Sequence, residues 1–238
     1  MKVTLTIDRQ IIHVERHMPI LDAAKKLGIF IPTLCYHEAL KPYGSCRLCM
    51  VEVIQNRRSR LVTSCNYPAE DGLTVLTASD RVKKTRKIVM ELLLARCPNV
   101  PLIRQLAEEM GVETARFKKR EDQRCILCGL CVRVCEEMVG VSAIGFVNRG
   151  TEREVNTPFG IQSHACIGCG TCTYICPTGC IEMVGNPDPP GGRSLNMGDL
   201  VLDSCPNNYE CDTCKIEHEF LADMKRVMDG VRIRTRNH

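Results

Sequence analysis

The sequence predicts an α+β protein made of four successive segments. Three observations carry this prediction: residues 3–15 alternate apolar and polar side chains, residues 78–111 have the spacing and caps of two helices, and 12 of the 17 cysteines stand in three close blocks. We therefore expect four segments in this order: an N-terminal domain (1–78), a helical bridge (79–118), a cysteine-rich domain (119–185) and a C-terminal extension (186–238).

The odd number of cysteines argues against a disulfide scaffold. Such scaffolds belong mainly to secreted proteins, and residues 1–8 lack the apolar core of a secretion signal. We therefore expect reduced thiols and a cytoplasmic location. No apolar run approaches the ~18 residues of a membrane span, so direct membrane insertion is not expected. The net charge of +4 is scattered along the chain, which argues against nucleic-acid binding.

The N-terminal segment begins with the pattern of a β-hairpin. Residues 3–7 and 11–15 alternate around a turn at 8–10, and Pro19 and Gly28 bracket a short apolar stripe that predicts a helix. Strand-like runs follow at 50–54 and 61–63. A small sheet with one helix is the expected result.

The first cysteine block belongs to this N-terminal segment. Its four members are separated by gaps of ten, two and fifteen residues: Cys35, Cys46, Cys49 and Cys65. This spacing follows plant-type [2Fe–2S] ligation with a lengthened first gap. Structural zinc is the alternative, but it normally uses two C-x2-C pairs and only one is present. The segment is thus predicted to be a β-grasp [2Fe–2S] ferredoxin domain, in which Gly44 lets the backbone pass close to the cluster.

The bridge is predicted to contain two helices. Ser79 is placed as the N-cap of the first, which carries apolar residues among Lys and Arg up to residue 95. The second begins at Pro101 and ends at Gly111. Cys97 stands alone between them, and we expect it to be a small buried apolar side chain.

The third segment contains an internal repeat with a period of 41 residues. Each copy has four cysteines with gaps of two, two and three residues, which is the bacterial two-cluster ferredoxin pattern, and in such proteins the fourth cysteine of each copy ligates the other cluster. We therefore predict a two-cluster [4Fe–4S] ferredoxin domain. Its expected ligand sets are Cys125, Cys128, Cys131 and Cys176 for one cluster, and Cys166, Cys169, Cys172 and Cys135 for the other.

The C-terminal extension follows a linker rich in proline and glycine. A candidate fourth site, for a third [4Fe–4S] cluster or for Zn, consists of Cys180, Cys205, Cys211 and Cys214. His218 could replace Cys180 in a zinc site. Scattered reduced thiols are the remaining alternative.

The order of these segments resembles the small diaphorase subunit of NAD-reducing hydrogenases. It is also similar to the N-terminal part of the large iron–sulfur subunit of NADH-quinone oxidoreductase, of NAD-linked formate dehydrogenases and of [FeFe]-hydrogenases. The resemblance covers residues 1 to about 185. It rests on the residues at 35–37 through Cys49, 90–93, 131–137 and 176–179. One departure concerns a [4Fe–4S] cluster that the family holds with one His and three Cys. The corresponding stretch offers only Cys97, so we expect that cluster to be absent.

The resemblance implies an electron-transfer subunit of a multi-subunit NAD(P)H-linked oxidoreductase, such as a hydrogenase or a formate dehydrogenase. The implied partners are a flavin-bearing, NADH-oxidising iron–sulfur subunit and a terminal redox subunit in a hetero-oligomer, and such assemblies can bifurcate electrons. The chain has no G-x-G-x-x-G fingerprint, so we expect no NAD or flavin site and no catalytic residue of its own. Two alternatives remain: a free-standing polyferredoxin shuttle, and a redox-sensing or interaction protein that depends on its clusters.

Overall fold

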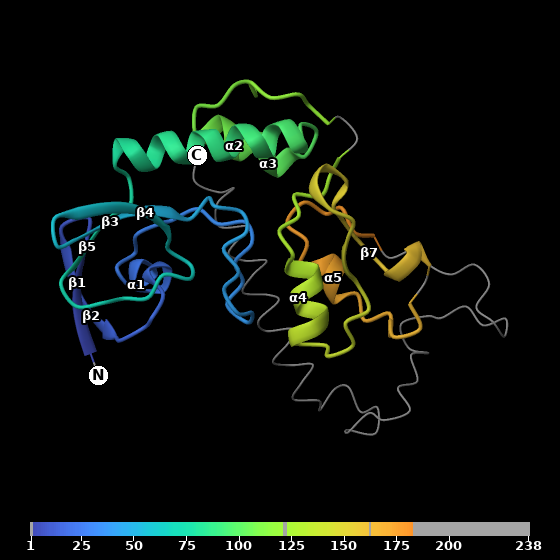
Figure 1. Cartoon of the computed structure of the whole chain (residues 1–238), viewed down its shortest axis with the longest axis horizontal. Coiled ribbons are helices and arrows are strands. Elements are labelled where there is room, and N and C mark those ends of the chain that lie inside the picture. Colours follow the sequence, from blue (N-terminus) through green and yellow to red (C-terminus); the bar gives the residue numbers. More distant parts are fainter. Residues whose placement is uncertain (1, 121–122, 162, 183–238) are drawn as a thin grey trace. The chain divides into compact units, whose positions relative to one another are not determined.

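The N-terminal residues form a five-stranded sheet with a helix packed against it (Figure 1). The structure is a computed structural model that describes residues 2–120, 123–161 and 163–182. The strand order is β2-β1-β5-β3-β4, with these bounds: β1 Lys2–Ile7, β2 Gln10–Glu15, β3 Met50–Gln55, β4 Arg58–Thr63 and β5 Leu73–Leu76. Helix α1, Ile20–Lys26, buries its apolar side against the sheet. The predicted β-grasp-like domain is therefore confirmed.

Both hairpins of this sheet turn through pairs of residues with positive φ. Asp8 and Arg9 have φ of 45° and 72°, and Asn56 and Arg57 have φ of 51° and 61°. Two such residues in succession form the tight turn whose twist matches that of the flanking strands. The carboxylate of Asp8 also accepts hydrogen bonds from the backbone N and the hydroxyl of Thr77, which follows β5.

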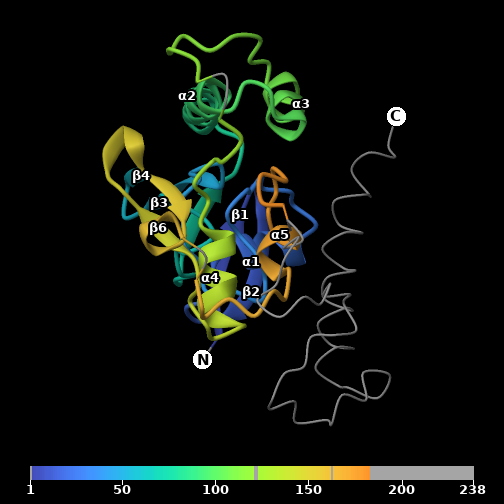
Figure 2. The same cartoon turned by 90° about the vertical axis from the view of Figure 1, so that its right-hand side faces the viewer.

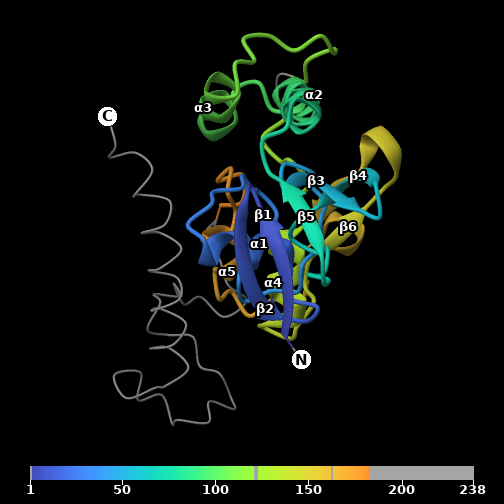
Figure 3. The same cartoon turned by 90° about the vertical axis from the view of Figure 1, so that its left-hand side faces the viewer.

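Strand β5 was not predicted, although it is the centre of the sheet. It pairs parallel with β1 and antiparallel with β3, as Figure 3 shows. Leu73 and Val75 are fully buried. This short strand joins the two hairpins into one sheet, which places the loops around the first cysteine block side by side.

Two helices that lie side by side and pack against each other form the bridge (Figure 2). Helix α2 spans Asp80–Arg96 and α3 spans Pro101–Glu109. Met90 and Ile103 are fully buried, whereas Ile88 and Leu92 are exposed. The predicted N-cap is confirmed, because the Ser79 side chain accepts a hydrogen bond from Val82 N.

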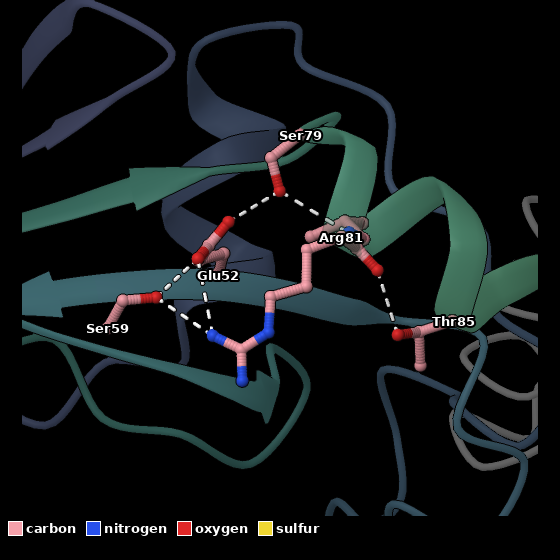
Figure 4. A network of polar contacts seen from close by, with 6 residues as sticks. Glu52, Ser59, Ser79, Arg81 and Thr85 are labelled. Atoms are coloured by element: carbon pink, nitrogen blue, oxygen red, sulfur yellow. Dashed lines mark hydrogen bonds and ion pairs between the residues drawn. The ribbon is translucent and has the colours of Figure 1, made fainter.

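A polar network fastens the start of α2 to the β3–β4 hairpin (Figure 4). The Glu52 carboxylate accepts hydrogen bonds from the hydroxyls of Ser59 and Ser79, the latter at 2.6 Å. Arg81 Nη1 lies 3.5 Å from Glu52 Oε1 and 3.1 Å from Ser59 Oγ. The side chain that caps the helix is thus itself held by the sheet.

The third segment consists of short elements joined by loops. Its helices α4, Leu130–Glu137, and α5, Thr171–Tyr174, pack against each other, and a small sheet pairs β6, Gly145–Val147, with β7, Glu154–Asn156. One 3-10 helix, Gly150–Glu152, precedes β7 and another, Pro158–Gly160, follows it. Each of α4 and α5 starts after a left-handed glycine. No helix in the described part of the chain is long and apolar enough to cross a membrane.

Candidate cluster-binding sites

The first cysteine block is gathered in the interior of the N-terminal domain. Cys35 lies in the loop after α1, Cys46 and Cys49 in the loop before β3, and Cys65 directly after β4. All four thiols are buried, Cys46 being the most exposed at 9%. The sheet therefore brings together four side chains that come from separate loops.

These four thiols form two hydrogen-bonded pairs. Cys46 donates its backbone N–H to Cys35 Sγ at 3.3 Å. The hydrogen bond from the Cys35 thiol lowers the pKa of Cys46 to about 6, and the bond from the Cys65 thiol lowers the pKa of Cys49 to about 7. The same hydrogen bonds, together with burial, raise the pKa values of Cys35 and Cys65. Metal ligation would require all four groups as thiolates, and buried thiolates need a positive partner, which a metal cluster provides.

Gly44 sits at φ +71° in the loop that carries Cys46. A Cβ at this position would lie 2.9 Å from Asn66 Nδ2. Asn66 is held in turn by the hydroxyl of Thr63 at the end of β4. The nearest neighbours of Gly44 are therefore the side chains beside Cys65, so the close approach joins two loops of the site.

The second group lies where α4 begins. Cys128 and Cys131 are buried, and Cys125 and Cys176 are half-buried. Leu127 has φ of 54°, and its N–H donates to Cys125 Sγ at 3.4 Å. The pKa is raised to about 11 for Cys128 and to about 12 for Cys131, mainly by burial and in smaller part by the neighbouring thiols, including that of Cys176. Cys176, the fourth expected ligand, thus lies near Cys128 and Cys131, and the crossed ligand set itself stays a prediction.

The third group is nearer the surface. Cys166 and Cys169 are exposed and Cys172 is half-buried on α5. Burial raises the pKa of Cys172, and the Cys169 and Cys166 thiols raise it further. Cys135, the fourth expected member, lies on α4, which packs against α5, and its Sγ accepts a hydrogen bond from Ala143 N at 3.3 Å.

Cys180 lies beside the second group. Its Sγ is 3.5 Å from Cys176 Sγ, and its side chain hydrogen-bonds Cys125. Its expected companions in a fourth site, Cys205, Cys211 and Cys214, lie outside the described residues, as does His218, so that site stays a prediction. Sequence spacing did not reveal the position of Cys180, because it stands four residues beyond the repeat.

Cys97 is completely buried between α2 and α3. Burial is the main cause that raises its pKa to about 11. The expectation of a small buried side chain is confirmed. In the described residues, no three His, Cys, Asp or Glu side chains meet in the compact arrangement that holds a single metal ion.

Arg133 joins the first site to the helix that carries Cys131 and Cys135. Its Nη2 donates to Cys35 O at 2.8 Å and its Nη1 to Lys41 O at 2.5 Å. The guanidinium carbon is 5.2 Å from the centroid of the Tyr43 ring. Sequence spacing gave no sign of this role, although the residue stands between two predicted ligands.

Two further bonds support the same contact. Lys41 N donates to Glu137 Oε2 at 2.9 Å, and Ser45 Oγ donates to Leu127 O at 3.3 Å. The loop of the first site is therefore bonded both to α4 and to the cysteine loop that precedes it.

Two protein-family models match the chain. Residues 1–80 match a 2Fe-2S iron-sulfur cluster binding domain, and residues 119–183 match a 4Fe-4S dicluster domain. These matches confirm one [2Fe–2S] domain and a domain for two [4Fe–4S] clusters. The gathered thiols of the first two groups and the backbone N–H donors to sulfur fit such clusters.

Several known proteins are similar to the chain. The alpha subunit of the NADPH-Fe(3+) oxidoreductase of Geobacter sulfurreducens is 38% identical over 215 residues, covering 80% of this chain and 25% of that protein. An NADH-quinone oxidoreductase subunit of Rhizobium meliloti is 34% identical over 205 residues, covering 75% of this chain and 24% of that protein. This chain thus spans about a quarter of the length of these curated relatives.

A solved structure is similar to this chain over about two thirds of its length. A chain in the crystal structure of an NAD+-reducing [NiFe]-hydrogenase in the H2-reduced state matches with a TM-score of 0.58 at 30% sequence identity. The match covers 68% of this chain and 82% of that one.

Proposed function

The chain belongs to the family of iron–sulfur electron-transfer modules found in subunits of NADH and NADPH oxidoreductases and of NAD-reducing hydrogenases, and on this premise we propose that it relays electrons within such a complex. The proposed partners are a flavin-bearing, NADH-oxidising iron–sulfur subunit and a terminal redox subunit. The two curated relatives described above are themselves named as subunits of oxidoreductases, which supports an assembly of several subunits.

The proposed ligands are the three cysteine sets expected from spacing. Cys35, Cys46, Cys49 and Cys65 would hold the [2Fe–2S] cluster. The two [4Fe–4S] clusters would be held by Cys125, Cys128, Cys131 and Cys176, and by Cys166, Cys169, Cys172 and Cys135. Bound clusters supply one-electron transfer, in which the protein forms and breaks no covalent bond.

The observation that carries the proposal is the bonded contact between the first site and α4. Arg133 bonds the carbonyl of Cys35 and stands on the helix that bears Cys131 and Cys135. The Cys46 thiol is also close enough to Cys128 to raise its pKa. This contact supports a direct path between the [2Fe–2S] site and the first [4Fe–4S] site. A further centre held by one His and three Cys is not needed on such a path.

The difference in burial between the sites suits a relay that ends at a partner. Cys35, Cys49 and Cys65 are almost fully buried, whereas Cys166 and Cys169 are exposed. A centre near the surface can approach a redox group on another subunit. We therefore assign the third group to exchange with a partner.

Iron analysis and EPR of the full chain, purified without oxygen, test the proposal. We expect about 10 iron atoms per chain, and stepwise reduction should give the signals of one [2Fe–2S] and two [4Fe–4S] clusters. A metal in the C-terminal extension would add about 4 iron atoms or one zinc. A chain with fewer than about 6 iron atoms, or clusters that no reductant can reduce, would contradict the proposed relay.

Association of the native protein separates this proposal from a free shuttle. Gel filtration of an anaerobic extract should place the chain in a complex much larger than its own 26.7 kDa. Elution of the whole population as a 26.7 kDa species would favour the free-standing polyferredoxin instead.

A further inference from the structure

One thiol more than a [4Fe–4S] cluster requires lies at the second cysteine group, because Cys180 stands beside the four proposed ligands. Cys180 donates its backbone N–H to Cys176 Sγ at 3.4 Å, and the two sulfur atoms are 3.5 Å apart. Its side chain also hydrogen-bonds that of Cys125. The extra thiol therefore contacts two of the four proposed ligands.

A tight turn brings Cys180 back to Cys176. Gly179 N donates to Cys176 O at 3.2 Å, and Gly179 has φ of 59°, a left-handed conformation that glycine adopts without strain. Arg124 holds this turn, because its Nη2 donates to Gly179 O at 3.0 Å and its Nη1 pairs with Glu182. Cys176 and Cys180 thus lie at the two ends of one anchored turn.

From this geometry we propose that Cys180 is a reserve ligand of the first [4Fe–4S] site, able to take the place of Cys176. The inference rests on the proposed cluster-binding function. The exchange breaks one Fe–Sγ bond to Cys176 and forms one to Cys180. The proton that leaves Cys180 is taken up by the freed Cys176 thiolate, and no electron is gained or lost.

The short distance makes the exchange a local change. Because the sulfur atoms are already 3.5 Å apart, small rotations of the two side chains bring one sulfur to the position of the other. Arg124 need not release the turn. The site would then have two ligation states with the same charge but different geometry at one iron.

Alanine variants of the full chain, purified without oxygen, test the proposal by iron content and EPR. We expect C180A to retain about 10 iron atoms. We expect C176A to retain them too, with a changed EPR signal for one [4Fe–4S] cluster, because Cys180 replaces the missing ligand. The double variant C176A/C180A should lose about 4 iron atoms.

Cys131 provides the matched control within the same site. It lies on α4, and neither Cys180 N–H nor the Cys180 thiol has a described hydrogen bond to it. C131A should therefore lose about 4 iron atoms even though Cys180 is present. Far-UV circular dichroism of each variant establishes that it folds.

Three outcomes would overturn the inference. C176A could lose as much iron as the double variant, C176A could keep an unchanged EPR signal, or C180A could lose iron or zinc while C176A loses none. The last result would assign Cys180 to the C-terminal site instead. If the wild-type chain itself lacks clusters, the proposed function fails, and that result differs from all three.

Discussion

Single residues control how closely the loops of the first site approach each other. Gly44 and Gly72 have the same φ of +71°, but their surroundings differ. A Cβ on Gly44 would meet the Asn66 side chain at 2.9 Å, whereas a Cβ on Gly72 would meet nothing within 4 Å. The pair therefore separates the cost of a left-handed backbone from the cost of a steric clash.

The variants G44A and G72A test this distinction. Both should lose about 1 kcal/mol of stability, because a residue with a Cβ is strained in the left-handed region. Only G44A should also displace Asn66 and reduce the [2Fe–2S] content, so that its iron falls from about 10 towards about 8 per chain. Iron analysis measures the cluster content, and thermal unfolding measures the stability of both variants. Equal iron content in the two variants would show that the Asn66 contact is unimportant.

Glu52 is a second residue whose role follows from its immediate neighbours. Hydrogen bonds from Ser59 and Ser79, together with Arg81, hold its pKa below the usual value of 4.5. A carboxyl with a lowered pKa in the folded state stabilises the protein above its unfolded pKa. That stabilisation is lost as the pH falls through the folded value.

E52Q should therefore lower the melting temperature by about 2–4 °C, since a hydrogen bond to a charged group contributes about 1 kcal/mol or more. The difference from wild type should be constant between about pH 8 and pH 5.5 and should shrink only below 4.5. E109Q, which alters a carboxylate bonded to Gln105 within one helix, is the control. Circular dichroism melts at several pH values give the comparison, and a difference that shrinks already at about pH 6 would contradict this assignment.

At the scale of elements, α4 connects the three proposed cluster sites. Its residues include two proposed ligands, and Arg133 from the same helix reaches two backbone carbonyls of the first ligand loop. A planar guanidinium can make both bonds at once, whereas an ammonium group cannot. The helix therefore fixes the loop of one site while it supplies ligands to others.

R133K and R133M separate the geometry of this contact from its charge. Both should destabilise the protein by about 2 kcal/mol, because R133M removes the charged donor from two carbonyls and the ammonium group of R133K cannot bond both of them at once. R133M should also lower the midpoint potential of the [2Fe–2S] cluster, since a nearby positive charge favours the reduced state, and R133K should largely keep it. Redox titration followed by EPR measures the midpoint potential of the [2Fe–2S] cluster in both variants.

The control for these variants is R104M. The described hydrogen bonds of Arg104 stay within residues 98–104, so its loss should leave the potential unchanged. An equal shift of the potential in R133M and R104M would show that Arg133 has no specific role.

At the scale of the whole described molecule, one apolar core joins three segments of the chain. It includes Leu48 from the first ligand loop, Met90 and Ile103 from the bridge, and Ile126 and Leu130 from the second cysteine group. The bridge helices thus contribute to this core. They do so although the sequence has no His between His37 and His164, and so lacks the His ligand of the further [4Fe–4S] cluster described above. They share this core with Cys46 and Cys128, one thiol from each of two proposed sites.

The sequence by itself determined the features that depend on local spacing. The hairpin of residues 3–15, the strand runs at 50–54 and 61–63 and the cap at Ser79 agree with the expectations, because turn residues, alternating side chains and helix caps act over a few residues. The cysteine gaps likewise allowed the kinds of cluster domain to be predicted without the fold.

Only the tertiary structure decided which distant segments meet. Strand β5 was missed because four residues carry too little periodicity, and its place between β1 and β3 depends on burial from both sides. The contact of Arg133 with the first site and that of Cys180 with the second group were not predicted, for a related reason. Their partners, Cys35 and Cys125, lie 98 and 55 residues away along the chain, and no local pattern records contacts that arise only when separate loops pack into one core.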